Sequence, residues 1–229
     1  MTAEELKSGY IFLLDKPLDW TSFQVVNKMK YKLKREFDLP KKFKIGHAGT
    51  LDPLASGLLL VCTGKFTKRI TELQGQAKEY TGTITIGATT PSYDLETEIN
   101  ETFPIEHITE DLIQETVKQF LGEIDQRPPI FSALKKDGIR LYEHARAGEE
   151  IEIPTRKTVI HEFEITRIAL PEVDFRVVCS KGTYIRSLAY DFGKAMNSGS
   201  HLTVLRRTKI GDYDVKNAID ITLFEESLQ

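Results

Sequence analysis

Apolar and polar residues recur along the chain with two periods, which predict an order of strands and helices. Near the start, Gly9–Leu14 predicts a strand that enters a turn at Asp15-Lys16-Pro17. A helix is expected from Thr21 or Ser22, either of which can cap it, to about Phe37. Its apolar residues recur at helical spacing, at Val26, Met29, Leu33 and Phe37.

The stretch from Pro40 to Ser56 is typical of a loop, because it contains two glycines and Pro53. Long loops inside compact domains tend to carry function. The elements expected after it are a buried strand at Gly57–Cys62, a short helix around Phe66–Leu73, a strand at Tyr80–Ile86 and a helix from Thr109 to Leu121.

In the second half, Pro128-Pro129 breaks the chain. The elements expected there are a short helix at Arg140–Ala147 stopped by Gly148, an antiparallel pair at Val159–Ile168 and Asp174–Ser180 joined near Pro171, a helix at Thr183–Met196 and a strand near His201–Arg206. Strands and helices do not alternate strictly, so the pattern predicts an α+β fold with a mixed or antiparallel sheet.

Composition narrows the class of protein. The 229 residues are 40% hydrophobic and 28% charged, which is typical of a globular chain that buries its own core. No apolar run approaches the roughly 20 residues of a membrane span, and no signal peptide is recognisable, so a cytoplasmic protein is expected. Cys62 and Cys179 form no metal or disulfide pattern and are expected to be buried thiols.

Charge is unevenly distributed. The chain has a net charge of −3, but the segment Asn27–Lys44 alone carries +6. Such segregation favours a surface that binds phosphates, although a solvated helix face followed by a basic loop would give the same pattern. The candidate contacts to an RNA backbone are Lys28, Lys32 and Arg35 on the outer side of the predicted helix and Lys41, Lys42 and Lys44 after it.

Common cofactor and metal motifs are missing from the sequence. It contains no dinucleotide-binding GxGxxG, no GxSxG, no complete phosphate loop at Gly64-Lys65 and no HExxH after His161. Nicotinamide, ATP and zinc chemistry therefore have no support, and we expect neither a cofactor nor a metal.

The segment Gly46–Gly57 has the most distinctive composition. Its glycines let a backbone approach a ligand closely, and Pro53 fixes the turn that carries Asp52. An aspartate before a proline is also a common turn former, so these residues alone leave both interpretations open.

GHAGTLDPLASGLLLVCTGKFTK, residues 46–68, resembles the catalytic motif of the TruB family of tRNA pseudouridine synthases, which modify the T-loop uridine at tRNA position 55. Six further segments resemble motifs of that family and follow in its order between about residues 9 and 210: Leu14–Pro17, Lys78–Tyr80, Ser132–Lys135, Leu141–Glu143, Ser180–Arg186 and Leu205–Arg207. Each motif alone is modest, whereas the ordered set is specific.

The resemblance implies the pseudouridine synthase fold, with a mixed, largely antiparallel sheet flanked by helices and a cleft that crosses the sheet. It implies one catalytic domain over residues 1–229. The reaction breaks the C1′–N1 bond of uridine and joins C5 to C1′. No group is added and nothing is oxidised, which agrees with the missing cofactor motifs.

The resemblance also assigns roles to residues. Asp52 is implied to be the catalytic carboxylate, with Arg186 as the cation that favours its ionised form and Tyr80 as the ring that stacks on the uracil and assists proton loss at C5. The other residues implied to bind substrate are His47, Tyr184, Leu205 and Lys16. Taken without the resemblance, Arg186 reads as a surface arginine at a helix start, and the tyrosines and Leu205 as core residues.

One departure from the family concerns the C-terminus, where 22 residues follow Arg207. Many relatives continue into an RNA-binding domain of the PUA type, for which 22 residues are too few. We therefore expect a stand-alone, monomeric enzyme that acts on the tRNA T arm without a guide RNA. Two alternatives stay open: an RNA-binding module without catalysis, and a pseudouridine synthase with another RNA target.

Overall fold

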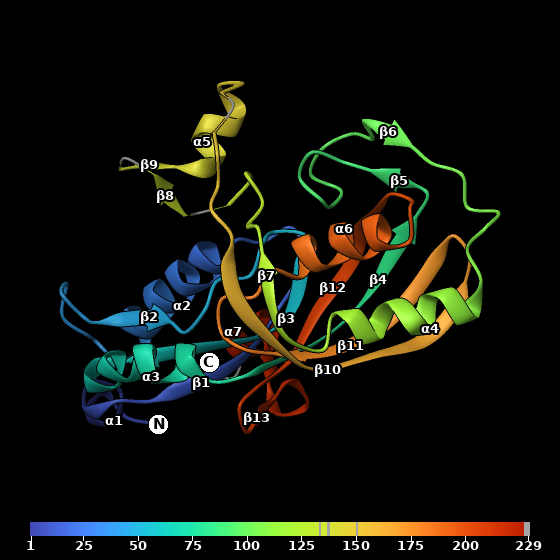
Figure 1. Ribbon diagram of the computed structural model, residues 1–229. Helices are drawn as coiled ribbons and strands as arrows, with labels where there is room; N and C mark the ends of the chain where they lie inside the picture. Colours follow the sequence, from blue (N-terminus) through green and yellow to red (C-terminus); the bar gives the residue numbers. More distant parts are fainter. Residues whose placement is uncertain (133, 137, 150, 227–229) are drawn as a thin grey trace. The chain divides into compact units, whose positions relative to one another are not determined.

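The computed structural model describes residues 1–132, 134–136, 138–149 and 151–226. The chain forms two compact units, one comprising Met1–Tyr80 with Leu205–Gln229 and the other Thr81–Val204 (Figure 1). Two strands, β4 (Lys78–Ile86) and β12 (Ser200–Ile210), run through both units. Each unit is described in turn.

The first unit begins with a helix, a strand and a longer helix: α1 (Ala3–Ser8), β1 (Ile11–Lys16) and α2 (Ser22–Glu36). Thr21 caps α2 in a capping box, in which its hydroxyl accepts a hydrogen bond from the Gln24 amide. The remaining elements of this unit are β2 (Ile45–His47), β3 (Ala55–Thr63), the 3-10 helix η1 (Gly64–Arg69), α3 (Ile70–Gly75), β13 (Tyr213–Asp214), the 3-10 helix η2 (Val215–Asn217), β14 (Ile219–Asp220) and α7 (Ile221–Glu226).

The sheet of the first unit is mixed. Its central strands follow the order β14-β1-β3-β12-β4, with β2 paired to β3 and β13 to β12. β1 runs antiparallel to β3, whereas β12 runs parallel to β3 and β14 parallel to β1. The register places Leu205 opposite Ala55 and Arg207 opposite Gly57, so β12 runs beside the segment that follows Asp52.

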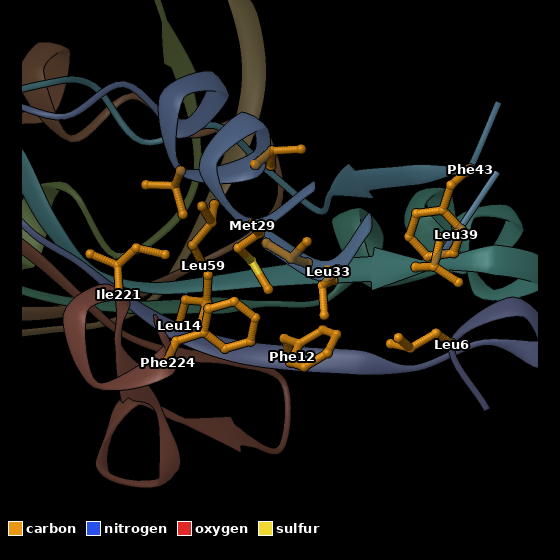
Figure 2. Packing of buried hydrophobic residues seen from close by; sticks show 13 residues of the cluster. Leu6, Phe12, Leu14, Met29, Leu33, Leu39, Phe43, Leu59, Ile221 and Phe224 are labelled. Carbon is orange, nitrogen blue, oxygen red and sulfur yellow. The ribbon is translucent and has the colours of Figure 1, made fainter. Parts of the chain in front are cut away.

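The core of the first unit lies between α2 and this sheet. Met29 and Leu33 of α2 point toward Leu14 of β1 and Leu59 of β3, as Figure 2 shows. Phe224 of α7 packs edge-on against Phe12, with ring centroids 5.5 Å apart. Because these side chains are buried, the apolar face of α2 fixes the helix on the sheet.

The second unit holds the other elements: β5 (Ala88–Thr89), β6 (Glu101–Thr102), α4 (Glu110–Gln119), β7 (Gly122–Gln126), β8 (Lys135–Lys136), β9 (Ile139–Arg140), α5 (Leu141–Arg146), β10 (Arg156–Ala169), β11 (Glu172–Cys179) and α6 (Ile185–Ala195). Its sheet follows the order β12-β4-β11-β10-β7, and β10 runs antiparallel to both of its neighbours. Aromatic rings from α6, β10 and β11 meet in the core. The ring centroid of Phe163 lies 6.1 Å from that of Phe175 and 5.6 Å from that of Phe192.

The sequence predicted most of the long elements and the fold class. A mixed sheet flanked by helices is confirmed, as are the caps at Thr21 and Thr109 and the antiparallel pair β10 and β11. Cys62 and Cys179 are buried thiols, as expected. No described helix is long and apolar enough to cross a membrane.

Three predicted boundaries were wrong. The chain at 66–73 forms a 3-10 helix followed by α3 rather than one helix, and the predicted loop at 40–56 contains strand β2. The turn expected at residues 15–17 starts later, because β1 continues to Lys16 along β3. In each case a pairing partner or a short tight helix overrides the local turn signals.

The packing of α2 leads to a stability prediction. Leu33→Ala removes a buried side chain from this core and should lower the free energy of unfolding by about 2–5 kcal/mol. The same change at Leu223, which is 55% exposed on α7, should cost no more than about 0.5 kcal/mol. Urea unfolding measures both, and equal losses would contradict the placement of α2.

Candidate active site

Asp52 lies in the turn between β2 and β3 and is half-buried. Its own carbonyl accepts a hydrogen bond from the Ala55 amide at 3.1 Å, which closes the turn around Pro53. The neighbouring Leu51 donates its amide to the Ser22 hydroxyl at 2.9 Å, and that hydroxyl donates to the Leu51 carbonyl at 3.2 Å. The first residue of α2 therefore fixes the loop beside the carboxylate.

Two glycines allow this loop to lie against β12. Gly57 has a φ of 103°, and a Cβ there would lie 2.3 Å from the Arg207 carbonyl oxygen. Gly49 has a φ of 101°, a region that side chains rarely adopt. The glycines of the segment thus serve a close backbone approach, as the sequence suggested, but the neighbour is the protein's own strand.

Two buried cations hold the carbonyl groups of the loop. Arg207 is 1% exposed and donates from Nη2 to Gly49 at 3.1 Å, from Nη1 to Thr50 at 3.4 Å and from Nε to Leu58 at 2.8 Å. Lys16 has no exposed surface, and its Nζ donates to Trp20 at 2.6 Å, to Pro17 at 2.7 Å and to Pro53 at 3.4 Å.

Charged neighbours also act on the Lys16 ammonium. Burial lowers the pKa of Lys16 to about 8, and the negative charges of Asp52 and Asp19 oppose that shift. The loop therefore presents a fixed carboxylate whose charge acts on a buried lysine.

The side chain of Lys16 is turned into the protein rather than toward solvent. The sequence assigned it to substrate binding, but its side chain is fully buried and its ammonium is occupied by backbone carbonyls. Lys16 is better described as a positioning residue for the Asp52 loop.

The other site residues predicted for this unit lie on three of its strands. His47 ends β2 five residues before Asp52, and burial lowers the pKa of its imidazole, so the ring is neutral at neutral pH. Leu205 on β12 is half-buried and pairs with Ala55. Tyr80 on β4 is 9% exposed.

In the second unit, Arg186 is buried in the first turn of α6 with 4% of its surface exposed. The alternative of a surface arginine is therefore wrong. Its guanidinium donates to the Phe131 carbonyl at 2.8 Å and the Ser92 carbonyl at 3.2 Å, and its Nε lies 3.5 Å from the Asp94 carboxylate. This arrangement fixes the orientation of the Arg186 guanidinium.

Tyr184 precedes α6 and is held by the buried Gln126. The side-chain amide of Gln126 accepts from the Tyr184 amide at 2.8 Å and donates to its carbonyl at 3.0 Å. The Arg156 guanidinium lies over the tyrosine ring, 4.6 Å from its centroid. The ring is half-buried and fixed by these contacts. The predicted motif Ser132–Lys135 also belongs to this unit, but its residue Ala133 lies outside the described residues.

The basic segment is only partly as predicted. Lys41, Lys42, Lys44 and Arg35 are exposed, and Arg35 forms an ion pair with Glu36 at 2.8 Å. Lys28 is half-buried, with its Nζ 5.0 Å from the centroid of the Trp20 ring. The expectation that Lys32 projects from the outer side of the helix is wrong, because Lys32 is 8% exposed. Val25 also faces the core, which widens the buried stripe until it includes Lys32, seven residues later.

Sequence reasoning missed three residues of this framework: Arg207, Asp94 and Gln126. Arg207 lies in a predicted motif, but its role is to donate hydrogen bonds to the carbonyls of Leu58 and Gly49, which the motif does not indicate. Asp94 and Gln126 lie in segments without a motif, and only the fold brings them to Arg186 and Tyr184. Within the described residues, no group of three or more histidine, cysteine, aspartate or glutamate side chains forms a metal site.

Comparison with known proteins identifies the family. Residues 34–185 match the family described as TruB family pseudouridylate synthase (N terminal domain). The chain belongs to the TruB family. The chain is 83% identical over 229 residues to a tRNA pseudouridine synthase B of Flavobacterium johnsoniae, covering all of both chains. It is 53% identical to one of Phocaeicola vulgatus, covering 97% of this chain and 94% of the relative. Pseudouridylate synthases are isomerases, so this TruB-family chain is an isomerase.

A solved structure supports the fold. The chain is 30% identical to a chain in the crystal structure of a Cbf5-Nop10-Gar1 complex, with a TM-score of 0.71. The match covers 97% of this TruB-family chain but 55% of that protein, so it spans about half of the solved chain. The pseudouridine synthase fold expected from the motifs is confirmed.

The burial of Lys16 leads to a prediction about pH. Because its pKa falls from 10.5 to about 8 on folding, the unfolded chain binds a proton between these values that the folded chain does not. The free energy of unfolding should therefore rise with pH across this window. Relative to Lys16→Met, the parent chain should gain stability from pH 8 to pH 10.5, as measured by urea unfolding.

The matched control is Lys7→Met, which removes an exposed lysine of the same unit. Its unfolding curve should follow that of the parent across the same window. If Lys16→Met also follows the parent, the ammonium of Lys16 is not buried as described.

Proposed function

We propose that this chain converts the T-loop uridine at tRNA position 55 to pseudouridine. The full-length likeness to relatives named tRNA pseudouridine synthase B supports this substrate. The observation that carries the proposal is the geometry of Asp52, a half-buried carboxylate on a loop fixed by two buried cations. A loop held this firmly suits a reaction in which one carboxylate must meet one atom of a sugar or base.

Asp52 is the reacting group in this proposal. The C1′–N1 bond of uridine breaks, the uracil turns, and C5 joins C1′ while the C5 proton leaves and N1 takes up a proton. An ionised Asp52 serves each route that this chemistry allows, namely attack on the sugar, attack on the base or removal of a sugar proton. The isomerisation is redox-neutral and adds no group, so no cofactor is required.

The uridine must leave the RNA stack before it can meet a half-buried carboxylate. Apolar and aromatic side chains recover part of the few kcal/mol that extrusion costs. We assign Tyr80, Tyr184 and Leu205 to the uracil, and the neutral His47 to the space that the everted nucleotides leave in the T loop. Tyr80 also assists the loss of the C5 proton.

Arg186 is the second charged group of the proposal. The carbonyls of Ser92 and Phe131 and the carboxylate of Asp94 fix the orientation of its guanidinium. We assign it to the stabilisation of negative charge at the active site, and we assign Asp94 to the orientation of Arg186.

The remaining expectations follow the same proposal. Both units act as one catalytic domain, because the family motifs occur in each of them. The enzyme works in the cytoplasm as a monomer on the T arm, without a guide RNA. The exposed cations Arg35, Lys41, Lys42 and Lys44 contact the RNA backbone together with Lys28.

The deciding experiment is tritium release from tRNA that carries tritium at uridine C5, followed by mapping of the modified position. Release with pseudouridine at position 55 supports the proposal. Release with pseudouridine at another position would indicate a synthase with a different target. RNA binding without release would indicate a module that only binds RNA.

Asp52→Asn tests the catalytic carboxylate. It keeps the shape of the side chain and removes its charge, so turnover should be abolished while tRNA affinity stays within about tenfold, or ~1.4 kcal/mol. Tritium release and equilibrium binding measure the two effects. Residual turnover above a few per cent would remove Asp52 from the catalytic role.

Arg186→Lys tests whether the fixed guanidinium matters beyond its charge. Lysine keeps the charge but loses the planar fork that reaches Ser92 and Phe131. We expect kcat to fall by about tenfold or more while tRNA affinity changes by no more than about threefold. The control is Arg167→Lys, an exposed arginine in surface ion pairs, which should leave kcat unchanged. An equal effect of both changes would contradict the role of Arg186.

A further inference from the structure

The outer side of α2 carries an open groove that the proposed chemistry does not use. Its volume is about 440 Å³, within the usual range of ligand sites. The lining residues are Asn27, Lys30, Tyr31, Lys34, Arg35 and Leu39, all in the first unit. We call this the α2 groove.

Aromatic side chains stand out on this side of the helix. Tyr31 in the groove and Phe23 at the start of α2 are each 69% exposed. They lie eight residues apart, so the two side chains are about 80° apart around α2 and about 12 Å apart along its axis. The opposite side already supplies the core with Val25, Met29 and Leu33. The exposed rings therefore lie outside this core and are accessible to a ligand.

Two lysines that line the groove, Lys30 and Lys34, can also contact a ligand. In the part of the chain that the structure describes, no carboxylate forms an ion pair with Lys30 or Lys34. Arg35 differs, because its guanidinium pairs with Glu36. Two lysines beside a flat exposed ring form a surface that complements a phosphate and a base.

The α2 groove belongs to the same rigid framework as Asp52. Ser22, the first residue of α2, is hydrogen-bonded to Leu51, the residue before Asp52. Tyr31 follows nine residues later, about 13 Å along the helix axis. An RNA whose uridine reaches Asp52 therefore has neighbouring nucleotides within reach of the helix.

We infer that the α2 groove binds an unpaired nucleotide of the substrate RNA, with its base stacked on Tyr31 and its phosphates beside Lys30 and Lys34. This inference rests on the proposed function, because the RNA is the one that presents its uridine to Asp52. The net charge of +6 on the segment 27–44, within a chain of net charge −3, favours RNA over a protein partner. Phe23 extends the surface toward Asp52.

Equilibrium binding of a whole tRNA transcript tests the stack. The parent chain and both Tyr31 variants carry Asp52→Asn so that the substrate is not consumed. Tyr31→Ala should weaken tRNA binding by about tenfold, whereas Tyr31→Phe keeps the ring and should bind tRNA like the parent. Thermal melting should be unchanged in both, because Tyr31 is exposed.

The salt dependence of the same binding tests the lysines. Lys30→Ala with Lys34→Ala should reduce the slope of log affinity against log salt by about 0.7 for each lost phosphate contact. The matched control is Lys65→Ala with Lys68→Ala, two exposed lysines of η1 in the same unit, which should leave the slope unchanged.

Photocrosslinking locates the contact directly. A tRNA transcript with 5-iodouridine in place of uridine should crosslink to Tyr31 in the parent chain, and the crosslink should disappear in Tyr31→Ala. Unchanged affinity of Tyr31→Ala, or crosslinks confined to residues outside α2, would overturn the inference and leave the groove to a protein partner. Failure of the proposed function is separate: the unsubstituted chain would then release no tritium, and the inference would fall with it.

Discussion

The buried contact between two cations and the carbonyls of one loop is the constraint on which the first unit depends. A loop that folds into the protein brings backbone carbonyls that water can no longer reach. Lys16 and Arg207 supply donors to these carbonyls, and they are among the largest fully buried side chains of the chain. Buried charge is costly unless it is compensated, and Asp52 and Asp19 are the carboxylates whose charges act on Lys16. One of the cations that order the loop is therefore compensated in part by the carboxylate that the loop carries.

This constraint explains why the hydrophobic core matters to a polar site. Met29 and Leu33 fix α2 on β1 and β3, and Ser22 at its start binds Leu51. Lys16 ends β1, and Arg207 lies on β12. Each support of Asp52 therefore sits at the end or side of an element whose apolar face is buried. A change in the packing of α2 would therefore shift the Ser22 hydroxyl, which holds Leu51 beside Asp52.

Sequence patterns predicted the elements with strong periodicity, such as α2, α4, α6 and β10. Ordered motifs also pointed to Asp52 and Arg186, whose catalytic roles stay predictions. The sequence patterns failed where a role depends on a partner distant in the chain. Lys16 was assigned to the substrate because its motif carries a lysine beside a proline, whereas the fold turns its ammonium to Pro53, 37 residues away. Lys32 was placed outside because one buried position, Val25, was missing from the apolar stripe. Asp94 had no signal, because its partner Arg186 lies on another element.

In the second unit, too, a buried cation donates hydrogen bonds to backbone carbonyls. Arg186 is buried at the start of α6, where it donates to the carbonyls of Ser92 and Phe131, and Asp94 supplies the opposite charge. In both units a buried cation links segments that are distant in sequence through carbonyl groups, which any residue provides. The identity of the residues that supply the accepting carbonyls is therefore free to vary, whereas the donating cation must keep its length and geometry.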